Sequence, residues 1–397
     1  MNYKIIAILR IFKAIIDLFV TTFFVMYFLS ISDSNILSLG IFYLIMYATI
    51  FATIFALRNF CKSKYRVNLL RLGILFNLVF FLLIFILQED ILLYIPLIAI
   101  IYGLEEGFYY SVYNNFESCG VNNKQRAKFM GVMEAVNSVV HFLIPLVFGS
   151  IMSIKGFQYC LVLVLACVVV QLICSMLYKD SLSAENKKCD LKAFYNIAKE
   201  NIIIKKIYKT ILYNGVIYSG AFSLIITIYI IRVFSDSMSF GIFTAIFALI
   251  TTLVGILFAK YIKPSSYINN IKLACVLTII GIVLIAISCN PVTVIIFNLL
   301  QSYSKTIIVL INSNSSISIS NIDAIKGYKV EYFLGLEKRY FFGRMIGYIL
   351  FIMLAISASV VWTDIVLGIF AIIIILLTRS LISLEKEFVD NKIYIKE

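Results

Sequence analysis

Long apolar runs separated by short polar stretches make up nearly the whole chain. Each run is long enough to cross a bilayer as an α-helix, which takes about 20 residues. The pattern predicts an all-α membrane protein of twelve transmembrane helices, at residues 5–30, 36–57, 69–87, 91–117, 129–154, 158–178, 208–231, 239–259, 271–289, 292–319, 340–360 and 362–381. The first run follows basic residues without a small-residue cleavage site, so it is interpreted as a retained span.

The connections between these runs alternate between short, nearly uncharged ones and basic ones. The basic residues gather on one side, in the stretches 58–66, 124–128, 179–209, 260–263 and 326–339. The positive-inside rule then predicts that both termini are cytoplasmic and that the protein lies in the plasma membrane. The same asymmetry explains the formal net charge of +13 without a nucleic-acid partner.

Composition narrows the possible functions further. The chain is 62% hydrophobic and 14% charged, which excludes soluble enzymes and nucleic-acid-binding proteins. No phosphate-binding GxxxxGK[ST] loop occurs, so no direct use of ATP and no cofactor are predicted. Cys160, Cys167 and Cys174 recur every seven residues on one helix face, where they are interpreted as packing residues. With one histidine and no CxxC, no metal site is predicted.

Two six-helix halves are predicted from a repeat in the pattern. Glu105 lies fourteen residues into the fourth run and Lys305 thirteen into the tenth, and both runs end in polar turns. The predicted domains are residues 1–178, a cytoplasmic linker at 179–207, and residues 208–397. Within the linker, Leu191–Ile204 has apolar residues at helical spacing, which fits either a helix on the membrane surface or a simple tether.

Three short elements carry a resemblance to a known family. The loop RNFCKSKYRVN holds Arg58 and Lys62, the element HFLIPLVFGS holds Pro145 and Gly149, and EKRYFFGR holds Glu337 and Arg344. With the 6+6 arrangement, they resemble the major facilitator superfamily over essentially the whole length. The resemblance implies gating or structural roles for these six residues and a central cavity lined by spans one, four, seven and ten. The first loop lacks the family's Gly and Asp, which speaks against its gating salt bridge.

The charged residues expected near the middle of the membrane fall on three of those four spans. They are Asp17, Glu105, Glu106 and Lys305. Asp17 either forms a local ion pair with Lys13, four residues earlier, or binds a proton or cation. The glutamates point about 100° apart on a helix, so they are expected to face different surroundings. Lys305 is predicted to neutralise one of them, or to bind an anionic substrate.

Further polar and aromatic residues complete the candidate site. His141 either relays protons or bonds a neighbouring helix. Tyr109, Tyr110, Tyr113 and Asn114 either line a pocket for an amphipathic molecule or, for the tyrosines, serve aromatic packing.

These observations predict a secondary active transporter that works by alternating access and is not an enzyme. Its partners are the bilayer, a small-molecule substrate and protons, with coupling through Glu105, Glu106 or Asp17 and efflux of a small amphipathic compound. One alternative is a non-transporting immunity or sensor protein on the same fold, which the incomplete loop at 58–68 favours. A second is a polytopic lipid-modifying enzyme, for which the chain lacks a nucleophile or metal constellation.

Overall fold

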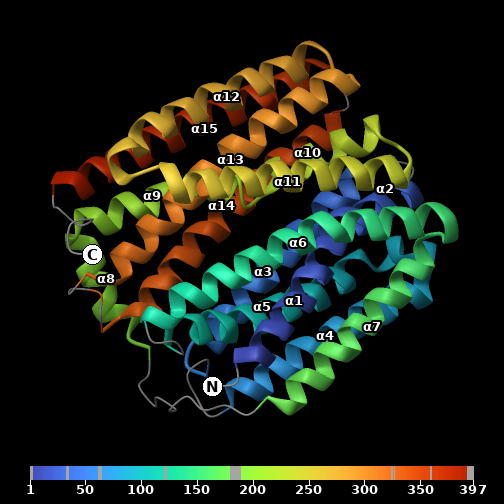
Figure 1. Ribbon diagram of the computed structural model, residues 1–397, viewed down its shortest axis with the longest axis horizontal. Coiled ribbons are helices and arrows are strands. Elements are labelled where there is room, and N and C mark those ends of the chain that lie inside the picture. The colour runs from blue at the N-terminus through green and yellow to red at the C-terminus, as the bar shows by residue number, and fades with distance from the viewer. Residues whose placement is uncertain are drawn as a thin grey trace. The chain divides into compact units, whose positions relative to one another are not determined.

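The computed structural model describes residues 3–32, 35–60, 65–119, 123–178, 189–322, 325, 327–357 and 360–390. In these ranges the regular elements are helices (Figure 1). The first unit of the chain contains α1 (Tyr3–Phe19), η1 (Val20–Phe24), α2 (Val25–Ile31), α3 (Ile36–Leu57), α4 (Arg66–Leu87), η2 (Gln88–Tyr94), α5 (Ile95–Cys119), α6 (Asn123–Lys155) and α7 (Phe157–Leu177).

The later elements begin with a short helix in the linker. They are α8 (Leu191–Glu200), α9 (Ile202–Ile217), α10 (Ala221–Val233), α11 (Ser237–Tyr261), η3 (Pro264–Ser266), α12 (Tyr267–Ile287), α13 (Pro291–Ser320), α14 (Lys329–Ser357) and α15 (Val360–Asp390). Two compact units form. One comprises Met1–Lys188 with Ser235–Ile246, and the other Cys189–Phe234 with Phe247–Glu397. The domain limits expected from the sequence remain a proposal.

Eleven stretches of the described chain are long and apolar enough to cross a membrane. One of them, Arg66–Val112, has 47 residues, about 70 Å of helix and twice what a bilayer needs. It contains both α4 and α5, so it covers two of the predicted spans. The chain is therefore an integral membrane protein whose helices follow the predicted twelve-span pattern.

Several boundaries differ from the expectation. The fourth span is not one helix from Ile91, because Gln88–Tyr94 form a 3₁₀ segment and α5 begins at Ile95. The seventh span is not continuous, since Tyr218–Gly220 separate α9 from α10. The eleventh span begins at Lys329, eleven residues before the predicted start. The apolar pattern alone places the start of a helix too late when its first turns carry charged residues.

The linker helix α8 packs on protein. Its Asp190 cap accepts a hydrogen bond from the Ala193 amide, and Asn201 ends it and caps α9. The Phe194 ring is buried beside Tyr328 and Tyr332 of the second unit. The stretch 191–204 is thus divided between α8 and the start of α9, and the Phe194 side of α8 packs against α14.

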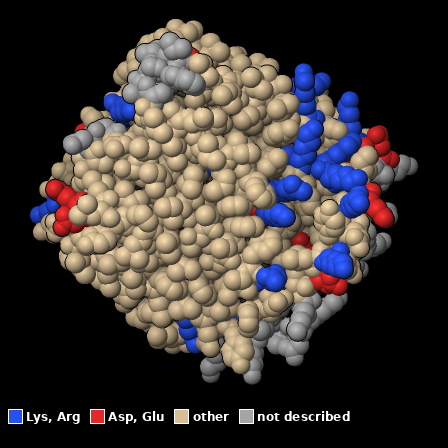
Figure 2. All heavy atoms as spheres, turned by 180° about the vertical axis from the view of Figure 1, so that it is seen from behind, with Lys and Arg blue, Asp and Glu red and all other residues tan. Residues whose placement is uncertain are grey.

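Exposed apolar side chains are typical of a surface in contact with lipid. On the face shown in Figure 2, a broad area carries no charged side chain, and Lys and Arg gather toward one edge.

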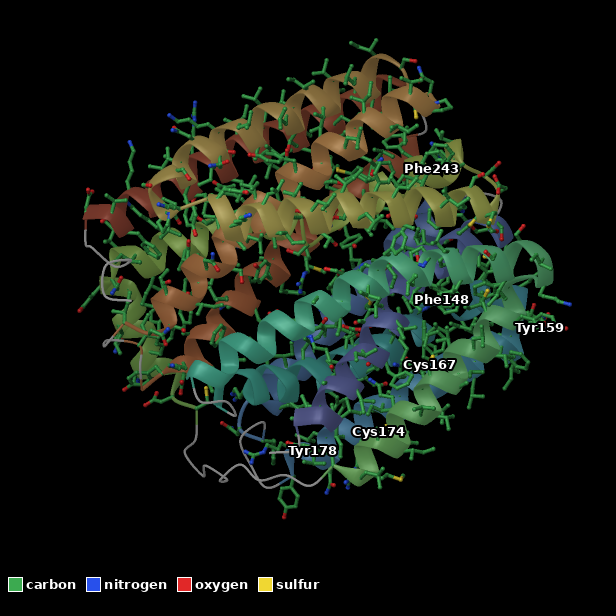
Figure 3. The ribbon with its side chains drawn as sticks, in the orientation of Figure 1. Phe148, Tyr159, Cys167, Cys174, Tyr178 and Phe243 are labelled. Atoms are coloured by element: carbon green, nitrogen blue, oxygen red, sulfur yellow. The ribbon has the colours of Figure 1, made fainter. Side chains whose placement is uncertain are left out.

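Figure 3 shows Tyr159, Cys167 and Cys174 along α7, and the described cysteines are free thiols. Cys160 is fully buried, as a small packing residue would be.

Candidate functional site: a lysine shared by three carboxylates

The first helix is held in place on both sides of Lys13. One turn before it, the Gln171 side chain of α7 donates to the Leu9 carbonyl at 3.1 Å. After it, the Phe19 ring lies 5.0 Å from that of Phe148 and 5.6 Å from that of Phe157. These contacts fix which face of α1 looks toward α5, and Lys13 lies on that face.

The α5 segment that carries the glutamates approaches its neighbours very closely. It reads GLEEG, with Gly103 and Gly107 one turn apart. A Cβ at Gly103 would lie 2.7 Å from the Met46 carbonyl, and one at Gly107 would lie 2.5 Å from the Thr53 Cβ, both on α3. Small residues at this spacing let membrane helices pack backbone to backbone.

A second glycine contact comes from α4. A Cβ at Gly73 would lie 3.1 Å from the Phe108 Cβ and 3.3 Å from the Glu105 carbonyl. The glutamates are thus carried by the most tightly packed part of α5, with α3 and α4 both against its backbone. Their side chains are confined to the remaining side, where α1 lies.

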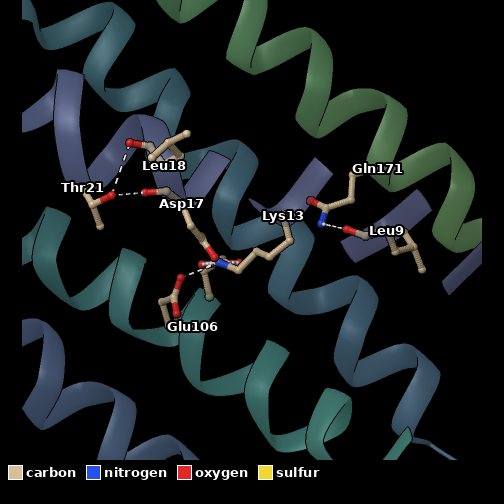
Figure 4. A network of polar contacts seen from close by, with 8 residues as sticks. Leu9, Lys13, Asp17, Leu18, Thr21, Glu106 and Gln171 are labelled. Carbon is tan, nitrogen blue, oxygen red and sulfur yellow. Dashed lines mark hydrogen bonds and ion pairs between the residues drawn. The ribbon is translucent and has the colours of Figure 1, made fainter. Parts of the chain in front are cut away.

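Lys13 is the centre of the site (Figure 4). Its amine donates to both carboxylate oxygens of Glu105, at 2.8 and 2.9 Å, and to Glu106. It also pairs with Asp17, one turn along α1, at 2.7 Å. The Tyr109 and Tyr102 rings lie 5.2 and 5.8 Å from the amine, within the range of cation–π attraction.

The members of this cluster differ in their exposure. The side chains of Lys13 and Glu105 are 3% and 1% exposed, whereas that of Asp17 is 30% exposed. Asp17 also precedes the π-helical segment η1, and its carbonyl accepts a hydrogen bond from the Thr21 hydroxyl at 2.8 Å. Such π segments within helices are frequent at functional sites. Asp17 is the carboxylate best placed to exchange with water.

Charge does not balance in the cluster. One ammonium faces three carboxylates, so the formal charge is +1 − 3 = −2 when every group is ionised. Uncompensated charge is expensive to hold in a membrane interior. The arrangement is therefore one that takes up protons or another cation.

Two expectations from the sequence are wrong at this site. The glutamates do not face different surroundings, because the long lysine side chain reaches both. Their counter-charge is Lys13, and Lys305 lies in the other unit, where it contacts Ser223. Of the two interpretations of Asp17, its ion pair with Lys13 is present. Lys13 was missed because it was taken only as that local partner, although it is a basic residue inside an apolar run.

A second set of polar residues surrounds the break in the seventh span. Lys305 donates to the Ser223 hydroxyl of α10 at 3.4 Å, and Arg344 donates to the Ser219 carbonyl at 3.2 Å. The Arg344 guanidinium lies over the Tyr340 ring and 3.8 Å from Glu337. Arg344 and Glu337 thus brace α14 against the break.

The remaining predicted residues lie apart from the lysine cluster. Arg58 donates to the Phe55 carbonyl at the end of α3. A Cβ at Gly149 would lie 2.7 Å from the Ser237 carbonyl, and one at Gly241 would press on the Pro145 carbonyl, so these positions form a close helix crossing. His141 is exposed on α6.

The tyrosines of the fourth span differ in their burial. Tyr109 is buried against Lys13, while Tyr110 is 38% exposed with its ring edge-on to that of Tyr109. Lys62 lies outside the described residues, as do the side chains of Tyr113 and Asn114.

The chain is similar to known proteins in its three-dimensional structure. No protein-family model and no curated protein sequence matches the chain. Among solved structures, a bacterial homologue of the iron transporter ferroportin in an inward-facing state has TM-score 0.68 and 12% identity, covering 96% of this chain and 98% of that one. The nucleoside transporter NupG has TM-score 0.68 and 12% identity, covering 97% and 99%. A POT family transporter in complex with 5-aminolevulinic acid has TM-score 0.69 and 9% identity, covering 94% of each.

These similarities extend over nearly the full length of each protein. The chain is an all-α membrane protein, and it has the same fold as these solved transporters. At 9–12% identity the similarity identifies the fold, and the function has to be argued from the site.

Proposed function

We propose that this protein is a secondary active transporter that works by alternating access and is coupled to protons. The observation that carries the proposal is the lysine cluster, in which Lys13 is shared by Asp17, Glu105 and Glu106. A proton changes the cluster's charge by one unit in a place where charge is expensive. A proton lowers the magnitude of the cluster's net charge, so proton binding favours whichever conformation gives the cluster the less polar surroundings.

The three carboxylates have different roles in this proposal. Glu105, with both oxygens on the lysine, stays paired and positions the amine. Asp17, the most exposed of the three, loads and releases the proton. Glu106, which is already bonded to the lysine, strengthens its pairing when Asp17 is protonated and so offsets the lost ion pair.

Direction and location belong to the same proposal. The substrate is a small amphipathic molecule, and the direction is export, supported by the Pro145 and Gly149 element and by the exposed ring of Tyr110. The protein acts in the plasma membrane with both termini in the cytoplasm, which the placement of the basic loops supports. The full-length similarity to transporters of several substrates supports transport in general.

The test uses inside-out vesicles with an imposed proton gradient that a pH-sensitive dye reports. A panel of amphipathic cations, sugars and short peptides is added to wild type, Asp17→Asn, Glu106→Gln and the exposed control Glu89→Gln. We expect one class of compound to collapse the gradient in wild type and in the control, and to fail with Asp17→Asn. Compound-dependent collapse that survives in Asp17→Asn would refute coupling at this site. Binding without solute movement in any variant would favour the sensor alternative.

A further inference from the structure

Lys305 differs from Lys13 in having no acidic partner. Among the described residues of its own unit, no carboxylate lies within ion-pair distance of its amine, and its hydrogen bond is to the Ser223 hydroxyl. It lies fourteen residues after Pro291, about 21 Å along a helix that is long enough to span the membrane. Its side chain is exposed. An ammonium at this depth, accessible and without a counter-charge, is a site for something that the chain itself does not supply.

The broken seventh span presents a complementary surface to the same amine. Ser223 lies in the first turn of α10, whose thirteen residues begin just after the break. The amide N–H groups of a first helical turn have no intrahelical acceptor, and the helix dipole makes that end positive. The Ser223 hydroxyl donates to the Tyr218 carbonyl at 3.2 Å, which holds it at the break. Lysine, hydroxyl and helix terminus together favour an anion.

Gln301 provides an independent sign of a missing partner. It lies one turn before Lys305 on the same face of α13 and is 4% exposed. Neither its amide nitrogen nor its amide oxygen has a hydrogen-bond partner among the described residues. Leaving both atoms of a buried amide unsatisfied is costly, so such groups normally bond a ligand or water.

We propose that Lys305, Ser223 and the first turn of α10 bind the oxyanion of the transported molecule, a carboxylate or a phosphate, with Gln301 bonding a polar group beside it. The inference rests on the proposed transport function and specifies its substrate as a molecule that carries an anionic group. It agrees with the lysine cluster as well, because Glu105 and Glu106 are paired with Lys13 inside the first unit.

The test is ligand binding by full-length protein in nanodiscs of zwitterionic lipid, followed by thermal unfolding. The probes are 3-phenylpropionate, phenyl phosphate and the neutral 3-phenylpropionamide. The variants are Lys305→Gln, Lys305→Arg and the control Lys272→Gln, which removes an exposed lysine from α12. We expect the oxyanions to stabilise wild type, Lys305→Arg and the control. Their affinity for Lys305→Gln should be about 10- to 100-fold lower, as for the loss of a charge-assisted hydrogen bond.

Three results would overturn the inference: equal binding of both oxyanions to Lys305→Gln and wild type, equal binding of the neutral amide, or no oxyanion-dependent shift in wild type. Because binding is measured without a gradient, it is independent of coupling. Oxyanion binding that depends on Lys305, without any proton movement, would refute coupled transport alone. Proton movement with oxyanion binding unaffected in Lys305→Gln would refute this inference alone.

Discussion

Replacing Lys13 with methionine removes the cluster's cation while keeping an unbranched side chain against Tyr102 and Tyr109. The amine forms three ion pairs, two of them at 2.7 and 2.8 Å. At an effective dielectric constant of 20, a pair about 3 Å apart gives roughly 5.5 kcal/mol of gross attraction. Desolvation of the charges offsets much of this attraction. Removing one partner of a buried pair typically costs about 3–5 kcal/mol. We therefore expect Lys13→Met to lower the free energy of unfolding by about that amount.

The assay is equilibrium unfolding in mixed micelles of increasing SDS content, followed by circular dichroism. The matched control is Lys206→Met, which breaks a 2.5 Å pair with Glu387 whose side chains are both 25% exposed. Such a half-exposed pair should be worth about 1 kcal/mol or less. Adding Glu105→Gln to Lys13→Met should recover part of the loss, since it removes one unpaired charge. Equal losses in Lys13→Met and Lys206→Met would refute the idea that the lysine holds the cluster together.

Three further predictions concern packing and termini. Gly107→Ala should destabilise the protein in the same assay because its methyl group meets α3, whereas Gly255→Ala, with open space around it, should be neutral or gain up to about 1 kcal/mol. Phe194→Ala should increase hydrogen exchange throughout α8, while Tyr195→Ala, on the exposed face, should leave it unchanged. Hydrogen bonds from the Ser239 hydroxyl and amide hold the pKa of Asp236 below its usual range. The stabilising effect of Asp236 on the start of α11 is therefore present at neutral pH and is lost as the pH falls through the acidic range. Hydrogen exchange at the start of α11, corrected for intrinsic rates, should therefore rise in wild type as the pH falls. In Asp236→Asn this acid-induced rise should be absent.

Much of the fold could be predicted because a membrane imposes a simple rule. A span must be apolar along its length, so runs such as 36–57 and 158–178 can be read directly, and α3 and α7 match them closely. Interruptions within a run are harder to predict. Tyr218–Gly220 break the seventh span inside a stretch that is apolar enough on average to read as one helix, and Arg344 donates to the Ser219 carbonyl at the break.

The site could be predicted only in part for a similar reason. Acids in an apolar run stand out, so Asp17, Glu105 and Glu106 were recognised from the sequence alone. Which cation serves them depends on how α1 and α5 meet, and Gly103 and Gly107 act on this only indirectly, by packing α5 closely against α3. The two glycines flank the glutamates in the sequence, and this small-xxx-small spacing is the signal that could have indicated a close partner helix.

The central claim, that the cluster around Lys13 is where protons couple to transport, is tested most directly by charge movement in proteoliposomes on a solid support. A rapid pH step is applied without substrate to wild type, to the triple variant Asp17→Asn, Glu105→Gln and Glu106→Gln, and to Glu89→Gln. The account predicts a transient current in wild type and in Glu89→Gln, and none in the triple variant once its folding is confirmed by circular dichroism. A current of the same size in the folded triple variant would contradict it.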